Sequence, residues 1–512
     1  MKKIKKALIS VSDKQNLKYI LKTLSKYKIE LISSGGTYKE INKLKFKCIE
    51  ISKYTESPEI LGGRVKTLHP KIHAGILNKR SNKIHQKEIK QNNFENIDLV
   101  IVNFYPFEKI LEKTNSHNKI IENIDVGGPT MVRAAAKNYN DVTIITSPKQ
   151  YDKLIKELNL NKGSTSLNFR QKMSEEAFSE TAYYDALISN YFNKLTKNFF
   201  PKKKIFFGNL IEKLRYGENP HQESALYSST NKLDIYQIHG KKLSYNNYND
   251  IFSALTISES LPKNTGTVII KHTNPCGVSI HKNHLKSYQL ALSCDPISAF
   301  GSVVFCNYKI NKNLALNLNK IFLEVIIGNS FEKKALKILK KKKNLRIIDT
   351  RNMSKKNINS FVSNFNSILV QSPDINSFSR KNFKIVSKKK PSTIEFQNLI
   401  FAFNICRFVK SNAIVIANNK STIGIGSGQP SRLDSCKIAI EKMNQFQNIQ
   451  NEKIVAASDA FFPFVDGVEK LVQAGVTAII QPSGSIKDKD IIKFANQTGT
   501  ALIFSKTRHF KH

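Results

Sequence analysis

The first 150 residues alternate short apolar runs with segments in which apolar residues recur at helical spacing. Four of these runs are typical of buried strands: 6–12, 29–34, 97–107 and 141–146. Residues 14–27 place Leu and Ile three and four positions apart, which favours one face of a helix. Because continuous apolar strands alternate with helices, we predict a parallel sheet covered on both faces.

Further along, helical and irregular segments divide the chain. Residues 35–44 are predicted to be a loop that opens a helix, and residues 127–138 a helix with Pro129 near its first turn. Residues 169–192 are also predicted to be helical, whereas 193–209 are irregular and basic, as expected of a linker. Strand and helix signals mix again from there onward. We therefore predict three parts: an α/β domain over 1–150, a helical connection and linker over 151–205, and a second α/β region over 206–512.

Composition permits a multidomain protein of a reducing compartment. The 512 residues are 40% hydrophobic, which suits about two to four domains of roughly 150 residues. No apolar run approaches the roughly 20 residues of a membrane helix. The basic start resembles a signal peptide, but polar Ser12 and Asp13 soon follow, so we predict a first strand instead. The six cysteines are scattered and form no disulfide framework, so we expect a cytoplasmic protein.

The net charge of +41 raises the alternative of nucleic-acid binding. The lysines are spread along the whole chain, however, and the short basic runs contain no interleaved aromatic residues. We therefore interpret the excess as solvated surface that attracts anionic substrates, and we expect no specific nucleic-acid partner. Strong salt dependence of nucleic-acid affinity would favour the alternative.

Two short loops follow the first two predicted strands and have the composition of phosphate sites. The string SVSDK ends the first strand with hydroxyls and Lys14, and SSGGT ends the second with Ser34, Gly36 and Thr37. Backbone N–H groups at a helix start bind phosphate, and the carboxyl ends of parallel strands meet in one crevice. Each loop alone is a plain strand-to-helix connection; together they predict an anion site.

A third polar loop, GGRVKTLHPKIHAGIL, gathers basic residues over 62–77. Metal binding by His69 and His73 is one interpretation, but no nearby Cys or acidic ligand supports it. A clamp for a phosphate or carboxamide is the other. Further on, Asp125 precedes a helix that carries Arg133 and Lys137 four residues apart. This pattern also fits a plain helix whose later cations complement its dipole.

The stretch TVIIKHTNPCG brings a lysine and a histidine to the end of a β-branched strand. Successive strand residues point to opposite faces, so Lys271 and His272 reach one pocket only where the strand ends and the chain turns. We predict that Asn274 and Pro275 supply this turn. Without other motifs, an unimportant cationic strand end is the favoured interpretation.

Eleven strings, in order and spacing, resemble the AICAR transformylase/IMP cyclohydrolase family of purine biosynthesis along essentially the whole chain. They are SVSDK, SSGGT, GGRVKTLHPKIHAGIL, VNFYPF, IDVGGPTMVRAAAKN, LRYGENPHQ, VIIKHTNPCGV, DPISAFGS, IGIGSGQPSR, ASDAFFPFVDGV and PSGSIKDKD. The resemblance implies a methylglyoxal-synthase-like parallel-sheet domain, then a cytidine-deaminase-like α/β transformylase region. It also implies transfer of a formyl group from 10-formyltetrahydrofolate to AICAR, followed by ring closure to IMP with loss of water.

Matching motif positions in the first domain imply a cyclohydrolase site. The residues implied to hold the nucleotide are Ser12, Lys14, Ser34, Gly36, Thr37, Arg64, Thr67 and Asn103. The residues implied at the reacting end are Lys66, Tyr105, Asp125 and Lys137, with Lys137 as the family's proposed proton shuttle. Ring closure needs such a proton acceptor and donor beside the carboxamide.

In the second region, the resemblance assigns His272 as the base that deprotonates the attacking amine, because imidazole titrates near ~6.5. Lys271 would stabilise the tetrahedral oxyanion or donate a proton toward the leaving folate nitrogen. The implied nucleotide-binding residues are Arg215, Tyr216, Gly301, Glu324, Asn412, Arg432 and Arg508, with Asn219 and His221 orienting the carboxamide. The implied folate-binding residues are Lys271, Leu433, Asp466 and Ser485.

Some features limit what the resemblance carries. A deaminase zinc site needs H-x-E and P-C-x-x-C, but PCGV lacks the second Cys, so we predict no metal. Gly328 and Asn329 replace the family's Ala-Pro after Glu324, which predicts a less rigid loop. A homodimer is implied by resemblance. An enzyme that retains only one of the two activities is a further alternative, although motifs of both halves are intact.

Overall fold

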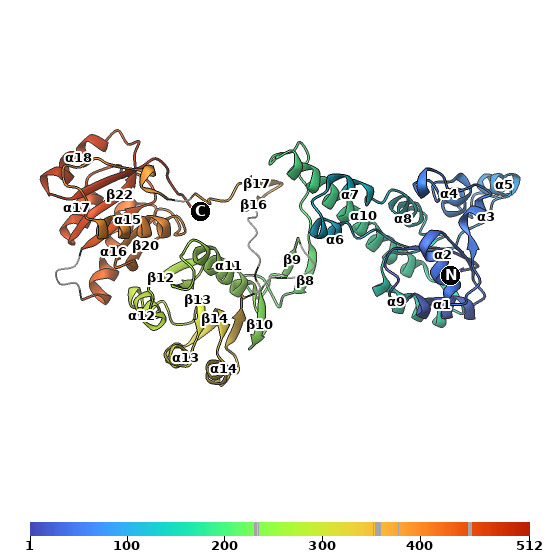
Figure 1. Cartoon of the computed structure of the whole chain (residues 1–512), viewed down its shortest axis with the longest axis horizontal. Coiled ribbons are helices and arrows are strands. Elements are labelled where there is room, and N and C mark those ends of the chain that lie inside the picture. The colour runs from blue at the N-terminus through green and yellow to red at the C-terminus, as the bar shows by residue number, and fades with distance from the viewer. Residues whose placement is uncertain (230–232, 234, 352, 354–359, 377, 449–452) are drawn as a thin grey trace. The chain divides into compact units, whose positions relative to one another are not determined.

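The computed structural model describes residues 1–229, 233, 235–351, 353, 360–376, 378–448 and 453–512. The chain divides into two compact units, Met1–Gly208 and Asn209–His512. Each unit has its own sheet (Figure 1). Each also has its own apolar cores.

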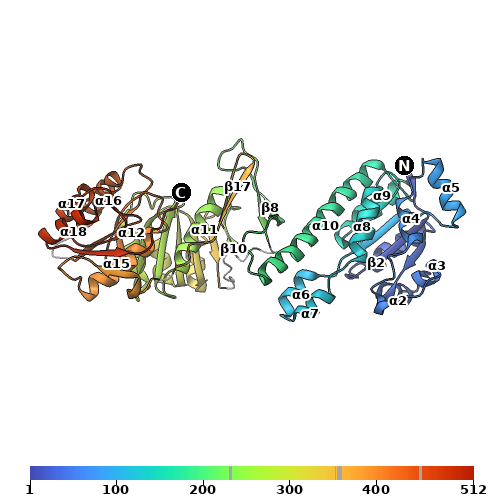
Figure 2. The ribbon, with the colours of Figure 1, turned by 90° about the horizontal axis from the view of Figure 1, so that it is seen from above.

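The first unit contains a five-stranded parallel sheet flanked by helices (Figure 2). In sheet order its strands are β4 (Ile49–Glu50), β3 (Glu30–Ser33), β2 (Lys6–Val11), β5 (Leu99–Asn103) and β6 (Thr143–Ile145). A short antiparallel pair joins β1 (Lys2–Lys3) to β7 (Ser164–Thr165). The helices are α1 (Leu17–Lys26), α2 (Gly35–Lys43), α3 (Ile51–Thr55), η1 (Leu61–Gly63), α4 (Pro70–Leu77), α5 (Lys83–Gln91), α6 (Phe107–Lys113), α7 (His117–Glu122), α8 (Gly127–Lys137), η2 (Pro148–Gln150), α9 (Tyr151–Leu160) and α10 (Leu167–Leu195).

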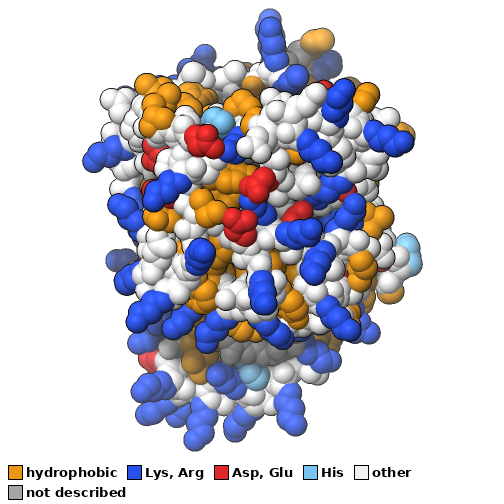
Figure 3. Space-filling model, turned by 90° about the vertical axis from the view of Figure 1, so that its right-hand side faces the viewer, with side chains coloured by type: hydrophobic (Ala, Val, Ile, Leu, Met, Phe, Trp, Pro, Cys, Tyr) orange, Lys and Arg blue, Asp and Glu red, His pale blue; other side chains and the backbone are white. Residues whose placement is uncertain are grey.

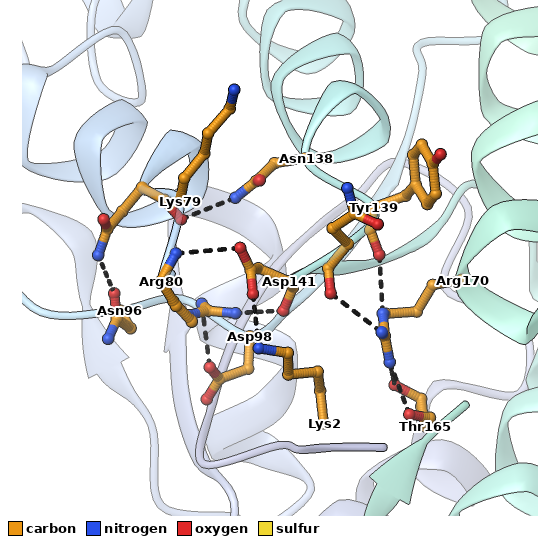
Figure 4. A network of polar contacts seen from close by, with 12 residues as sticks. Lys2, Lys79, Arg80, Asn96, Asp98, Asn138, Tyr139, Asp141, Thr165 and Arg170 are labelled. Carbon is orange, nitrogen blue, oxygen red and sulfur yellow. Dashed lines mark hydrogen bonds and ion pairs between the residues drawn. The ribbon is translucent and has the colours of Figure 1, made fainter. Parts of the chain in front are cut away.

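A buried polar network fixes the amino ends of the strands of this sheet (Figure 4). Asp98, just before β5, accepts the backbone N–H groups of Lys5 at 2.7 Å and Lys6 at 3.1 Å, beside the start of β2. Arg80 forms an ion pair with Asp98 at 3.1 Å, and Arg170 of α10 donates to the carbonyl of Tyr139 at 2.7 Å. These charged groups pair at the amino ends of the strands, whereas sheets of this kind bind ligands at the opposite edge, at the carboxyl ends.

The second unit is built on a twelve-stranded mixed sheet and two separate hairpins. In sheet order the strands are β10 (Tyr236–His239), β15 (Arg346–Asp349), β14 (Leu323–Phe331), β13 (Ser302–Ile310), β11 (Gly266–Lys271), β12 (Asn274–Ile280), β20 (Ser421–Gly426), β19 (Ile414–Asn418), β21 (Ile454–Ser458), β22 (Val476–Pro482), β23 (Ala501–Ser505) and β18 (Phe383–Ile385). The hairpins are β8 (Asn209–Lys213) with β9 (Ala225–Ser228), and β16 (Ser360–Asn364) with β17 (Ser367–Gln371).

Helices cover both faces of this sheet in three layers (Figure 1). One face packs against α11 and α15 in a single core, whereas the other face carries two separate cores, one under α12–α14 and one under α16–α18. The helices are α11 (Tyr245–Glu259), α12 (His284–Cys294), α13 (Lys312–Leu318), α14 (Lys333–Leu339), η3 (Arg380–Asn382), α15 (Thr393–Cys406), α16 (Arg432–Phe446), α17 (Asp466–Gln473) and α18 (Asp488–Gln497).

The element order of the second unit repeats. A helix, an antiparallel hairpin and three helix–strand pairs occur first as α11 to β15 and again as α15 to β23. Both hairpins shift register at the same place, and both carry a glycine there whose added Cβ would collide with a helix carbonyl. For Gly277 that oxygen is of Ala291, at 1.9 Å; for Gly424 it is of Ala439, at 2.1 Å. The two halves are therefore built to one plan and meet where β12 pairs with β20.

Candidate functional sites

In the first unit, the loops after β2 and β3 and the end of β5 meet at the carboxyl edge of the sheet. The side-chain oxygen of Asn103 accepts the N–H groups of Ser12 at 2.7 Å and Asp13 at 2.9 Å, and its nitrogen donates to the Asp13 carbonyl at 3.0 Å. Asn103, a predicted nucleotide-binding residue, thus closes the loop after β2.

Two lysines from different loops converge on the first turn of α2. A Cβ added at Gly35 would lie 3.2 Å from Nζ of Lys66, and one added at Gly36 would lie 3.9 Å from Nζ of Lys14. Gly35 also has a positive φ of 52°, a conformation that glycine adopts without strain. Free N–H groups of a helix start and two ammonium groups together form an anion site.

Other predicted nucleotide-binding residues of this unit are buried or already bonded to other residues of the chain. The Thr37 hydroxyl is buried, and it accepts the N–H of Val11 and donates to its carbonyl, both at 3.0 Å. Ser34 is buried before α2. Arg64 is exposed and forms an ion pair with Glu122 of α7. Thr37 therefore shapes the anion site from beneath.

At the start of α8, a carboxylate meets a lysine and a tyrosine. The Asp125 carboxylate accepts the N–H of Gly128 at 2.8 Å. Burial raises the pKa of Asp125, although the backbone N–H groups of Gly128 and Tyr105 and the charge of Lys66 oppose the rise. Burial and the Asp125 charge also raise the pKa of Tyr105. The Thr67 hydroxyl lies at the same helix start, 2.7 Å from a Cβ added at Gly127.

Lys137 lies away from this cluster. It is exposed and is the last residue of α8, whereas Asp125 precedes the first. A helix rises ~1.5 Å per residue, so α8 separates its two ends by about 15 Å. The next residue, Asn138, donates to the carbonyls of Ile76 at 2.8 Å and Asn78 at 2.9 Å, in the network at the opposite edge of the sheet (Figure 4). The predicted shuttle role of Lys137 stays a prediction.

In the second unit, the chain turns directly after Lys271. His272 and Thr273, with φ of 51° and 63°, form the two-residue turn between β11 and β12. The prediction of a turn at Asn274–Pro275 is wrong by two residues. Pro275 lies in β12 beside the register shift, where an N–H for the strand ladder is not needed.

This turn borders a small pocket of about 150 Å³. Nζ of Lys271 donates to the carbonyl of Phe300 at 2.7 Å, and the base of the pocket holds an ion pair between Asp295 and Lys442. Burial disfavours ionisation of Asp295, but Lys442 and Ser298 outweigh it and lower its pKa. Lys271 and His272 thus line one pocket, as predicted, whose further lining residues are Asn274, Pro275, Cys276, Ile425 and Ser427.

Gly301 and Glu324 lie at the same sheet edge as Lys271, because β13 and β14 begin where β11 ends. Glu324 is held by Arg346 of β15, with 2.5 Å between Oε2 and Nη1. The predicted loop after Glu324 is instead part of β14, and Nδ2 of Asn329 donates to the Asn307 carbonyl at 2.7 Å. This strand pairing replaces the rigidity that a proline would supply.

A second cluster lies just before β19, directly after β21 and at the start of α16. Arg432 is buried; it donates to Asn412 Oδ1 at 2.8 Å and forms an ion pair with Asp459 at 2.8 Å. Ser411, beside Asn412, accepts the N–H of Lys511 at 3.2 Å, which brings the C-terminal segment with Arg508 to this cluster. The contacts of Arg432 position Asn412.

The remaining predicted residues lie on loops and helix starts of the same unit. Arg215 stacks over Tyr216, and the Asn246 side chain of α11 donates to the Glu218 carbonyl of that loop at 3.2 Å. The same loop carries Asn219 and His221. It therefore contacts α11, the helix whose Asp250 accepts a hydrogen bond from the His272 turn. The predicted folate residues lie at the starts of α16 and α17 and just before α18: Leu433, Asp466 and Ser485.

Among the described residues, no group of three or more His, Cys, Asp or Glu side chains lies close enough together to bind a metal ion. In the same residues, no helix is both long and apolar enough to cross a membrane. On the face shown in Figure 3, Lys and Arg side chains are scattered among acidic and apolar ones.

Two α/β units, each with its own cluster of ionisable side chains, fit an enzyme with two active sites. Family models agree: an MGS-like domain matches residues 16–130, and the AICARFT/IMPCHase bienzyme matches residues 135–442. The chain belongs to the AICARFT/IMPCHase bienzyme family. It is thus an AICAR formyltransferase and IMP cyclohydrolase of purine biosynthesis, and its family uses a formyl-folate co-substrate.

Relatives support this along the full length. The bifunctional purine biosynthesis protein PurH of Persephonella marina is 44% identical, over 99% of this chain and 100% of its own. That of Prochlorococcus marinus (strain MIT 9515) is 45% identical, over 99% of both. A solved structure described as the crystal structure of ForH is 30% identical over 37% of this chain and 99% of its own, with a TM-score of 0.34. The predicted family, fold class and function are confirmed.

Proposed function

We propose that the second unit transfers the formyl group of 10-formyltetrahydrofolate to AICAR at the His272 turn. The AICAR amine attacks the formyl carbon while His272 takes its proton, and the bond from that carbon to the folate nitrogen then breaks. Lys271 stabilises the oxyanion of the tetrahedral intermediate. The observation that carries this proposal is the turn after Lys271, which places both side chains on one pocket.

The first unit then closes the ring between α2 and α8. Lys14 and the start of α2 hold the phosphate, and Asp125 exchanges protons with the carboxamide nitrogen as it attacks the formyl carbon. Its raised pKa suits a group that must both accept and return a proton. Lys66, which lies between α2 and Asp125, stabilises the oxygen that finally leaves as water.

Three further expectations belong to the same proposal: a cytoplasmic location, a homodimer, and catalysis without a bound metal. The homodimer is supported by an open apolar groove in the second unit, lined by residues such as Phe252 and Leu369, of which Leu369 is 67% exposed. A second copy of the chain would cover it. Sedimentation of the full 58.1 kDa chain checks this, and a monomer at working concentration contradicts it.

Reconstitution tests the two site assignments together. Purified protein receives AICAR and 10-formyltetrahydrofolate, and formyl-AICAR, IMP and tetrahydrofolate are separated by chromatography. We expect IMP from the wild type, no tetrahydrofolate release by H272A, and accumulation of formyl-AICAR by D125N. A protein-free control corrects for uncatalysed ring closure. Tetrahydrofolate release by H272A at the wild-type rate would remove the assignment of His272.

A further inference from the structure

The two halves of the second unit allow the His272 turn to be compared with its counterpart in the same chain. In the second half, the β19–β20 turn is formed by Asn419 and Lys420, with φ of 48° and 57°. These values match those of His272 and Thr273. A positive φ is uncommon for residues other than glycine, although Asn and His adopt it more often than most, and for the β-branched Thr273 it is a genuine outlier. Each turn therefore needs a partner that holds its backbone.

The partner occupies the same position in both halves. Asp250 and Asn398 are each the sixth residue of their helix, α11 and α15. The N–H of Thr273 donates to Oδ1 of Asp250 at 2.7 Å, and the N–H of Lys420 donates to Oδ1 of Asn398 at 2.9 Å. A neutral amide oxygen is thus enough to hold a turn of this shape.

The first half differs from the second in that Asp250 places a negative charge beside two ionisable side chains, His272 and Lys271. Burial raises the pKa of Asp250, while the N–H groups of Thr273 and His272 and the charges of His272 and Lys271 oppose the rise. The Asn419 position of the other half carries no ionisable group. The carboxylate at Asp250 therefore does more than the turn requires, because its charge also acts on His272 and Lys271, the two residues proposed to act on substrate.

We propose that Asp250 is a positioning residue for formyl transfer: it fixes the His272 turn and stabilises the imidazolium that forms when His272 accepts the amine proton. The proposal rests on the role of His272 proposed above. The proton moves from the amine to His272 and on to the departing folate nitrogen; Asp250 supplies only charge and a hydrogen-bond acceptor. The other charged groups around the turn are Lys271 of β11 and the Lys442–Asp295 pair across the pocket.

The test is the D250N enzyme, which recreates in the first half the amide that holds the turn in the second. We expect the kcat of formyl transfer to fall at least about ten-fold, part of the 10²- to 10⁴-fold that a positioned proton acceptor supplies. His272 must be neutral to act, and loss of the negative charge disfavours its protonation. The acidic limb of the pH–rate profile should therefore move to lower pH, by about one unit.

Controls separate this role from a purely structural one. E441Q removes an exposed acid of α16 that lines neither the pocket nor the apolar groove, and it should leave rate and profile unchanged. T273G relieves the backbone strain at the turn. If adding T273G to D250N restores the wild-type rate, Asp250 only holds the turn and the proposal is wrong. The same conclusion follows if D250N lowers the rate without moving the acidic limb of the pH–rate profile. A D250N enzyme with wild-type rate and profile also overturns it. H272A tells the two proposals apart, because its full activity would remove the role of His272 itself.

Discussion

At the scale of single residues, each proposed site contains a carboxylate whose pKa is raised by burial and which lies beside a lysine. These are Asp125 with Lys66 and Asp250 with Lys271. The carboxylate of the structural pair in the second unit, Asp295, has a lowered pKa instead. Sites of proton transfer often hold a carboxylate whose ionised form is disfavoured by burial, whereas an ion pair stabilises the ionised form of its carboxylate. In these three carboxylates, the direction of the pKa shift follows the role proposed for each.

D125N tests the energetic side of this difference. An acid with a raised folded-state pKa binds its proton more tightly when folded, so its ionised form costs stability above that pKa. The amide removes this cost and keeps an acceptor for Gly128. We expect D125N to lose ring closure. At pH 7.5 its free energy of unfolding should be unchanged or higher by on the order of 1 kcal/mol or less, so its melting temperature should be the same or slightly higher. A clear drop in melting temperature would show that the carboxylate is structural.

K66M and K137M form a matched pair, because each replaces one lysine of the same unit by an uncharged side chain of similar length. Lys66 lies between the start of α2 and Asp125, whereas Lys137 lies about 15 Å along α8 from it. We expect K66M to lower the kcat of ring closure by at least about ten-fold and K137M to lower it less. The rates are measured with supplied formyl-AICAR. A larger loss in K137M would mean that α8 or its surroundings rearrange when substrate binds.

The residue scale also shows where sequence is informative. The prediction that Lys271 and His272 share a pocket is sound, because a β-branched run followed by polar residues marks a strand end. Asp250 gave no such signal, since it lies 22 residues before His272 on a helix, and only folding brings them together. The pairing of Glu324 with Arg346 is invisible for the same reason.

At the scale of elements, the apolar runs of the first domain predicted its central strands well. The predicted helix 169–192 lies within α10, Leu167–Leu195. The predicted turn at Asn274 and Pro275, in contrast, is strand, and Gly277 of the same strand is needed for close contact with α12. Local composition cannot distinguish a glycine in a turn from one under a helix. The repeated element order was missed because it lies in topology rather than in short-period sequence.

K442M tests the contact that joins α16 to the end of α12. It leaves Asp295 buried without its ion pair, and since Lys442 is 34% exposed we expect a loss of about 2 kcal/mol at neutral pH. The folded-state pKa of Asp295 is lowered, so the stabilisation is present above the unfolded value of ~3.9 and disappears as the pH falls through the folded value. Chemical denaturation at pH 7 and pH 3 should show a large difference from wild type only at pH 7.

At the scale of the whole molecule, the two chemistries are built on independent cores. The main apolar cluster of the first unit runs from Ile4 to Ala177, and its smaller cluster includes Phe107 and Tyr184. The buried residues of the three clusters of the second unit all lie between Leu243 and Phe504. A separate core is what allows a domain to fold alone.

Two fragments test this independence. We expect 1–208 to unfold cooperatively and to convert supplied formyl-AICAR to IMP at a rate within about two-fold of the full chain, because its cluster of Lys14, Lys66 and Asp125 comes from within the fragment. We expect 209–512 to release tetrahydrofolate in the presence of AICAR but to accumulate formyl-AICAR. Mixing the fragments should restore IMP without restoring a complex. An inactive but folded 1–208 would show that ring closure needs groups from the second unit, and the division of labour proposed here would then be wrong for that step.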